Sequence, residues 1–188
     1  MRVILGAGQT AIDGWMATQE SDLNLLSDDG WNRLFAPESI DALLAEHVWE
    51  HLTRDEGVEA ARRCFRYLKP GGYLRCAVPD RNFRNAWYQQ MLQGGGPGTM
   101  DHPAASHKIV YDWKALVEVF TAAGFEVSLL EYCDEQGDFH YTYWNEADGR
   151  IGRSFRFDTR NSREALGMVS LIVDAKKPLV IPHAGEPC

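Results

Sequence analysis

Two histidines and a glutamate stand at a chemically suggestive spacing near the middle of the chain. His47, Glu50 and His51 match an HxxEH pattern, in which two histidines one helical turn apart bind zinc and the glutamate acts as a base. The pattern requires a helix, whereas residues 40–45 read as a strand and the next helix cap falls later, at Thr53. We therefore expect His47 at the edge of a strand, and a zinc hydrolase is the less favoured alternative.

The segment 40–80 predicts the elements that must position these side chains. An apolar run at 40–45 ends at Glu46 and His47, and a second run at 73–78 ends at Pro79 and Asp80. Between them, Thr53 to Glu56 form a capping box, apolar residues at 58, 61, 65 and 68 predict one helix face, and a Pro-Gly-Gly turn at 70–72 ends the helix. Because a crossover between parallel strands is right-handed, both strand ends should meet at one edge of a sheet.

A glycine turn follows the first apolar run of the chain. Residues 2–5 predict a strand that meets Gly6, Ala7 and Gly8, where a ligand could approach the backbone closely. Residues 14–19 predict a second strand, and too few residues separate the two strands for a crossover helix. Residues 22–26 fit either a third short strand or a turn. By itself the glycine turn is weak evidence, because such turns also serve other nucleotides and simple packing.

The second half of the chain predicts two more helices and several strands. We expect helices at 83–92 and after Asp112, a long loop at 99–108, and strands at 125–132 and 168–175. Residues 139–144 and 154–157 alternate like a hairpin. The aromatic residues there fit a hairpin face packed on the sheet better than a substrate pocket or dimer contact, and the arginines at 150–163 fit a solvated face better than an anion site.

Length and composition limit the class of protein. The 188 residues carry a formal net charge of −8, which argues against binding nucleic acid unaided. The four cysteines lack CxxC spacing, so we expect reduced packing residues, no metal, and a cytoplasmic protein. No apolar run approaches the length that crosses a bilayer. We expect one domain at 1–178, with 134–167 as a β-rich insertion, and a loose tail at 179–188.

Three segments together resemble the class I S-adenosylmethionine-dependent methyltransferases. They are Val3-Ile4-Leu5-Gly6-Ala7-Gly8, the segment from Ser39 to Leu52, and the segment from Arg66 to Arg75 that runs into Val78-Pro79-Asp80. The last two are fairly specific in tandem. The match is closest to a group of bacterial methyltransferases with a shortened first glycine loop that leads into a Gly-Trp strand, as Gly14-Trp15 does here.

The resemblance implies a Rossmann-like, doubly wound α/β fold with a mostly parallel seven-stranded sheet, an antiparallel last strand and helices on both faces. It also implies S-adenosylmethionine as cofactor and an unidentified small molecule as methyl acceptor. The cofactor residues that it implies are Gly6, Ala7 and Gly8 beneath the methionine part, Gln19 or Glu20 at the ribose, Asn24 and Leu25 at the adenine, and Glu46 and His47 beside the methyl donor.

The chain departs from the family pattern in two places. The family usually has an acidic residue at the end of the second strand, where Gln19 or Glu20 falls here, and an amide binds a diol less strongly than a carboxylate does. The family's N-terminal helix is also missing, so a homodimer or the insertion must cover that face. A methyltransferase-like domain that binds a ligand or partner without catalysis is therefore the alternative function.

His107 and Tyr111, together with His102, lie where the family's substrate loop would cover the site. A histidine there could remove a proton from the accepting atom, which makes His107 and Tyr111 the catalytic candidates. Methyl transfer does not require such a base, because the sulfonium already makes the methyl group electrophilic. The alternative is that the loop histidines bond to backbone.

Overall fold

The strand order places the predicted parallel unit at the centre of a mixed sheet. The structure, a computed structural model, describes residues 1–92 and 103–179. Within these residues the sheet has seven strands in the order β2-β1-β3-β4-β7-β5-β6. The strands are β1 (Arg2–Leu5), β2 (Trp15–Ala17), β3 (Ile40–Glu46), β4 (Leu68–Pro79), β5 (Glu126–Cys133), β6 (Phe139–Tyr141) and β7 (Ser170–Lys176).

Half of the strand pairings are parallel. β1 pairs in parallel with β2 and β3, and β3 with β4, whereas β7 lies antiparallel between β4 and β5, and β6 is antiparallel to β5. The predicted α/β Rossmann-like sheet with an antiparallel last strand is therefore confirmed. The sheet is half parallel rather than mostly parallel, because β7 and β6 pair antiparallel on one side of β4. Because β1 and β3 are parallel neighbours, the glycine turn after Leu5 and the polar residues after Ala45 emerge at the same edge.

The helix between β3 and β4 forms where its capping box predicts. The helices are α1 (Asp28–Leu34), α2 (Arg54–Tyr67), α3 (Ala86–Leu92) and α4 (Trp113–Ala122). Thr53 and Glu56 make both bonds of the box, and Asp112 caps α4. The buried face of α2 is centred on Gly57, Ala60 and Cys64 rather than on the larger Val58 and Phe65. These small side chains let the helix approach the sheet closely.

Two local predictions are wrong, and one that the sequence left open is decided by the structure. Pro70, Gly71 and Gly72 lie within β4, where the register against β3 shifts and Gly71 adopts φ +80°, so the predicted turn is a bulge in the strand. Residues 154–157 form turns instead of the predicted strand, and residues 22–26 form turns rather than a third strand.

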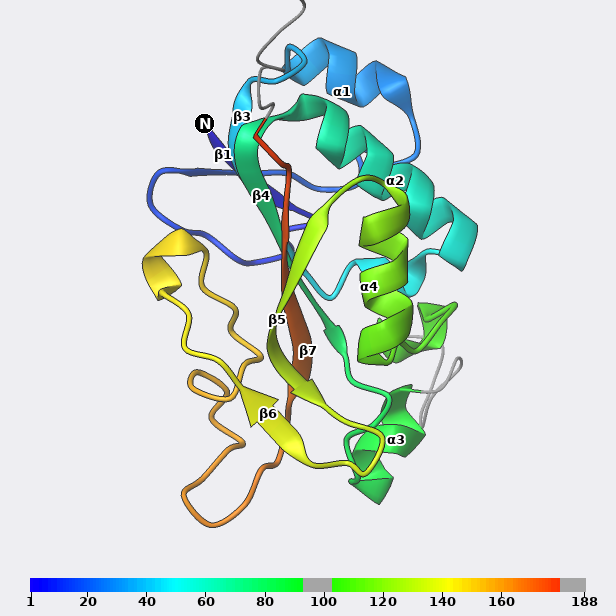
Figure 1. The fold of residues 1–188 in the computed structure, drawn as a ribbon, viewed down its shortest axis with the longest axis vertical. Coiled ribbons are helices and arrows are strands. Elements are labelled where there is room, and N and C mark those ends of the chain that lie inside the picture. Colours follow the sequence, from blue (N-terminus) through cyan, green and yellow to red (C-terminus); the bar gives the residue numbers. More distant parts are fainter. Residues whose placement is uncertain (93–102, 180–188) are drawn as a thin grey trace, which may run out of the picture.

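The two faces of the sheet are covered differently (Figure 1). Helices α1, α2 and α4 pack on one face, around a core that includes Trp31, Cys64 and Phe120. On the other face, Trp144 and Ile151 of the 142–167 segment pack against strand residues such as Leu44. This segment covers that face in place of the second helical layer that the resemblance implies.

Candidate functional site

A glycine-lined edge opens where β1 and β3 end. Gly6 and Gly8 both adopt positive φ, +57° and +54°. A Cβ on Gly6 would come within 2.9 Å of a methyl of Val48, whereas a Cβ on Gly8 would meet nothing within 4 Å. Gly6 is therefore required by both its conformation and its contact, and Gly8 leaves open space beside the backbone. The space beside Gly8 is compatible with the predicted close approach of a ligand to this turn.

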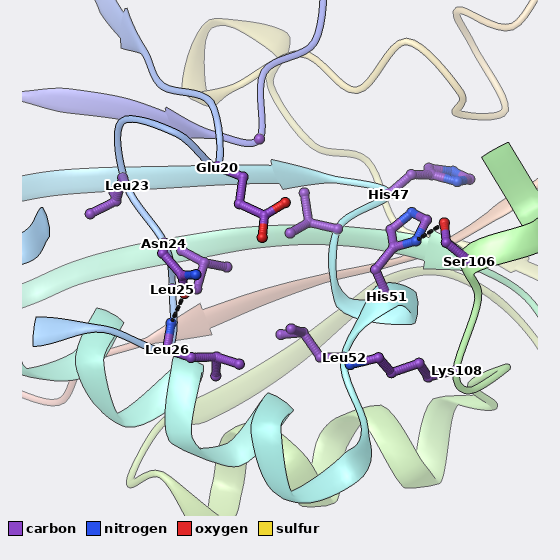
Figure 2. A pocket seen from close by; sticks show the side chains of 12 residues that line it. Glu20, Leu23, Asn24, Leu25, Leu26, His47, His51, Leu52, Ser106 and Lys108 are labelled. Carbon is purple, nitrogen blue, oxygen red and sulfur yellow. Dashed lines mark hydrogen bonds between the residues drawn. The ribbon is translucent and has the colours of Figure 1, made fainter.

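Two adjoining cavities lie at this edge, and they share Gly6 and His47. The first, about 520 Å³, is lined by Gly6, Glu20, Leu23, Asn24, Leu25, Leu26, His47, Val48, His51, Leu52, Ser106 and Lys108 (Figure 2). The second, about 500 Å³, is lined by Gly6, Ala7, Gly8, Gln9, Thr10, Glu46, His47, Gly152 and Arg153. Each has the size of a small-molecule site. They adjoin at the two shared residues, Gly6 and His47.

The first cavity combines an acidic group with apolar walls. Figure 2 shows the Glu20 carboxylate reaching into the space between Asn24 and His51, with leucine side chains below it. The Asn24 side-chain oxygen accepts from the backbone N–H of Leu26 at 2.8 Å, which fixes the turn that supplies this wall. Such a site could bind a nucleoside: the carboxylate can accept hydrogen bonds from two neighbouring sugar hydroxyls, and the apolar walls can pack against a flat ring.

Gln19 is the one predicted cofactor residue that lines neither cavity. Its side-chain oxygen accepts from the Gly8 N–H at 3.1 Å, and its amide nitrogen donates to the Gly8 carbonyl at 2.9 Å. Both ends of the amide therefore hold the glycine turn in place. The other eight predicted residues, Gly6, Ala7, Gly8, Glu20, Asn24, Leu25, Glu46 and His47, all line one cavity or both.

Glu46 joins the strand edge to the insertion. Its two carboxylate oxygens accept from the backbone N–H groups of Arg153 at 2.8 Å and Gly152 at 3.0 Å. The insertion therefore closes one side of the second cavity. Sequence reasoning did not predict Gly152 or Arg153 as site residues, because no local pattern brings a loop more than a hundred residues away to this strand end.

His47 occupies a strained position between the cavities. Its φ of +58° is unusual for a residue with a side chain, and such strain is found most often at functional sites. Its Nε2 lies 3.0 Å from Ser170 Oγ, and its Nδ1 lies 3.1 Å from Glu50 Oε1. The ring is thus fixed on both sides, with its backbone N–H donating to Ala77.

Glu50 is a fully buried carboxyl group beside three histidines. Its Oε1 lies 3.1 Å from His47 Nδ1 and 4.0 Å from His107 Nε2, and His51 completes the group. Burial works to raise the pKa of Glu50, but the neighbouring His47 and His51 and the backbone of Glu50 itself together outweigh it, so the net direction is downward. Burial lowers the pKa of His107. An ionised carboxylate therefore lies beneath the first cavity.

The predicted catalytic residues lie behind the cavities rather than in their walls. His107 is nearly buried, and its Nδ1 bonds to the carbonyl of Leu92 at 3.1 Å. Tyr111 is wholly buried in the helix-side core, where burial raises the pKa of its hydroxyl. His102 lies outside the described residues. His51, Ser106 and Lys108 line the first cavity instead; of these the HxxEH pattern had pointed only to His51.

The HxxEH segment does not lie on an α-helix. β3 ends at Glu46, residues Trp49–His51 form a single 3₁₀ turn, and α2 begins at Arg54. The two histidines therefore lack the helical spacing of a zinc peptidase, as the strand-like run before them predicts.

Comparisons with known proteins agree with this architecture. A family model described as "Methyltransferase domain" matches residues 14–76, about a third of the chain. A search of curated proteins found no match. Among solved structures, a SAM-dependent methyltransferase from Archaeoglobus fulgidus is 14% identical, with a TM-score of 0.53 over 94% of this chain and 86% of that one.

Two further solved structures show the same fold. A SAM-dependent methyltransferase from Methanosarcina mazei is 18% identical, with a TM-score of 0.51 over 93% of this chain and 72% of that one. The cyclase SpnF is 16% identical, with a TM-score of 0.51 over 95% and 74%. The chain therefore has the fold of the class I methyltransferases. Because a cyclase shares it, the fold alone does not set the reaction.

Across residues 1–92 and 103–179, every helix is too short or too polar to cross a bilayer.

Proposed function

We propose that this protein is an S-adenosylmethionine-dependent methyltransferase that acts on a small molecule. The observation that carries the proposal is the pair of cavities that meet at Gly6 and His47, with a glycine turn in one and a carboxylate over apolar walls in the other. The family match over residues 14–76 and the shared fold support the same cofactor.

The residues of the first cavity fit the nucleoside part of that cofactor, and those of the second cavity fit its methionine part. Glu20 would accept from the ribose hydroxyls, which removes the weakness that an amide at Gln19 would introduce, and Asn24 and Leu25 would border the adenine. The open backbone at Gly6, Ala7 and Gly8 would take the methionine part in the second cavity, beside Glu46 and His47.

The bound cofactor supplies an electrophilic methyl group on a sulfonium. The chain itself has to hold donor and acceptor in line and keep water away, which supplies much of the rate of such a transfer. The acceptor would enter the second cavity, where the exposed Arg153 could meet an anionic group. The proton-accepting roles of His107 and Tyr111 stay predictions, since neither residue lines a cavity.

We place the protein in the cytoplasm as part of the proposal. Cys64, Cys76 and Cys133 are buried and unpaired, which suits a reducing compartment, while Cys188 lies outside the described residues. The 142–167 segment covers the second face of the sheet, so a homodimer is not needed for that purpose.

Calorimetric titration with S-adenosylhomocysteine tests the cofactor site. We expect saturable binding with one site per chain, and about tenfold or more weaker binding for Glu20→Gln, which loses the charge at the diol. Glu126→Gln is the matched control, because Glu126 is exposed at the opposite end of the sheet. No measurable binding by folded protein would contradict the proposal.

A second measurement separates catalysis from binding alone. Protein incubated with a metabolite extract and S-adenosylmethionine carrying a deuterated methyl group should yield a labelled product, detected by mass spectrometry. Binding of S-adenosylhomocysteine without any labelled product would favour the non-catalytic ligand-binding alternative.

A further inference from the structure

The buried Glu50 carboxylate faces groups that do not donate to it. It is 0% exposed, and neither of its oxygens has a hydrogen-bond donor among the described residues. His47 Nδ1 is close, at 3.1 Å, but is not aligned as a hydrogen-bond donor to it. A buried carboxylate without donors is strongly unfavourable, so this site requires a positive group that the side chains do not supply in their neutral forms.

The outer hydrogen bonds of the histidines set which ring nitrogen carries the proton. Leu92 offers a carbonyl to His107 Nδ1, so that nitrogen is the N–H and Nε2 keeps its lone pair toward Glu50. Ser170 Oγ already donates to Arg153, so it accepts from His47 Nε2, and His47 Nδ1 faces Glu50 with a lone pair. His51 Nδ1 is bonded to Ser106 Oγ at 2.9 Å.

The Glu50 carboxylate and one ring nitrogen each of His51 and His107 therefore lie around one small volume. One ligand atom each from Glu50, His51 and His107 lie within 4.8 Å of one another. In a tetrahedral zinc site such atoms lie about 3.3–3.6 Å apart, so side-chain shifts of about 1 Å would close the group around an ion. The His107 ring also has an oxygen partner at its other nitrogen, the Leu92 carbonyl, which is the outer arrangement of metal-binding histidines.

We propose that Glu50, His51 and His107 bind a divalent transition-metal ion of the Zn²⁺ type at the floor of the first cavity. His51 lines that cavity, whereas Glu50 and His107 lie behind it, so the fourth coordination position faces the cavity. Three protein ligands with one open position are the arrangement of a zinc ion that binds or polarises a ligand oxygen. This metal site does not require that the protein bind S-adenosylmethionine. It also differs from the zinc site that the HxxEH pattern would form, because its second histidine ligand is His107 instead of His47.

Metal analysis of the full chain tests this site. Chelator-treated protein is titrated with Zn²⁺ in competition with a chromophoric chelator, and Co²⁺ is added in parallel to give the visible absorption of a tetrahedral site. We expect one ion per chain, and affinity lower by on the order of a hundredfold or more in His107→Gln and Glu50→Gln. His140→Gln is the matched control, because His140 is an exposed histidine bonded to Asp134.

The stability of the Glu50→Gln variant shows whether a loss of metal binding reflects a lost ligand or a misfolded protein. Glu50→Gln should fold at least as well as the metal-free parent, because its amide can donate to a histidine lone pair, yet Zn²⁺ should raise the melting temperature of the parent alone. Absence of stoichiometric metal, with Glu50→Gln less stable than the parent, would show that a protonated histidine balances the carboxylate and would overturn the proposal. Equal Zn²⁺ binding by the parent and both variants would show surface binding only and would overturn it as well.

Discussion

The two faces of the sheet are held by different kinds of interaction. On the helical face, apolar side chains of α1, α2 and α4 pack on alternate strand residues. On the other face, the irregular 142–167 segment is anchored by buried charged groups: Arg75 reaches Asp174 and the carbonyls of Asn145 and Gly149, and Glu131 accepts from Trp144 Nε1 and the Phe155 N–H. Regular elements need only an apolar stripe, whereas an irregular cover needs partners for its backbone groups.

The difference matters for the site, because each cavity includes residues from a different cover. Ser106 and Lys108 of the first cavity lie on the chain that leads into α4, whereas Gly152 and Arg153 of the second belong to the irregular segment. Loosening the charged anchors should therefore disturb the second cavity before the first.

The largest effect should come from Arg75→Met. Arg75 is 2% exposed and stacks on Trp144 as well as bonding to Asp174. Its loss leaves a carboxylate and two carbonyls without their donor, so we expect the free energy of unfolding to fall by about 3–5 kcal/mol. Urea denaturation measures it. Arg63→Met, a partly exposed ion pair on α2, should cost less than about 1 kcal/mol, and similar losses in both variants would break the comparison.

A buried acid at the carboxyl end of β4 should make stability depend on pH. Burial raises the pKa of Asp80 to about 6, against the hydrogen bonds from Cys133 and Asn82. The folded state then holds this proton more tightly than the unfolded chain does. This contribution to the free energy of unfolding is fully present below about pH 4 and is lost as the pH rises through about 6, and it amounts to on the order of 3 kcal/mol.

Asp80→Asn should remove this part of the pH dependence. Unfolding free energies measured at about pH 4 and about pH 7, on either side of the transition, should differ less in Asp80→Asn than in the parent. Asp13→Asn, at an exposed position, serves as the control. An unchanged pH profile in Asp80→Asn would contradict the assignment.

The link between the irregular cover and the site is tested by Glu46→Gln. One of the two backbone N–H groups of Gly152 and Arg153 would face an amide nitrogen instead of an oxygen. We expect a loss of about 1–2 kcal/mol in stability and roughly tenfold weaker binding of S-adenosylhomocysteine by calorimetry. Unchanged binding together with lowered stability would separate the segment from the site.

The smallest effect should come from Gln19→Glu, which restores the acidic residue of the family pattern. A carboxylate cannot donate to the Gly8 carbonyl as the amide does. We therefore expect S-adenosylhomocysteine binding to weaken several-fold, by about 1 kcal/mol. Tighter binding would show that Gln19, rather than Glu20, faces the ribose.

The family pattern near the glycine turn could be aligned from the sequence only to within one residue. Gln19 and Glu20 both fell near the end of the second strand, and the sequence left the choice open. The structure distinguishes them by the hydrogen bonds of their side chains. The Gln19 amide is hydrogen-bonded to the backbone of Gly8, whereas the Glu20 side chain faces the first cavity. A residue of suitable type is available to a ligand only when the fold leaves its polar atoms free.

The arginine-rich segment shows the same limit. Its arginines predicted a solvated hairpin face, but Arg156 stacks over Trp144 and Phe157 and bonds to the Trp144 carbonyl, and Arg160 pairs with Asp158. Alternation at 154–157 predicted a strand because it reports side-chain polarity alone. It does not report whether a neighbouring strand is available to pair with.

The sequence by itself determined the central β3-α2-β4 unit, the glycine turn and the apolar run of the last strand, because apolar periodicity, capping boxes and glycine act within a few residues of one another. The antiparallel direction of that strand came instead from the family resemblance. The tertiary structure alone decided that the 142–167 segment covers the second face, that Gly152 and Arg153 close the second cavity, and that His107 comes to lie beside Glu50. Those contacts join residues far apart in the chain, and their energies depend on burial and on which hydrogen-bonding atoms remain unpaired.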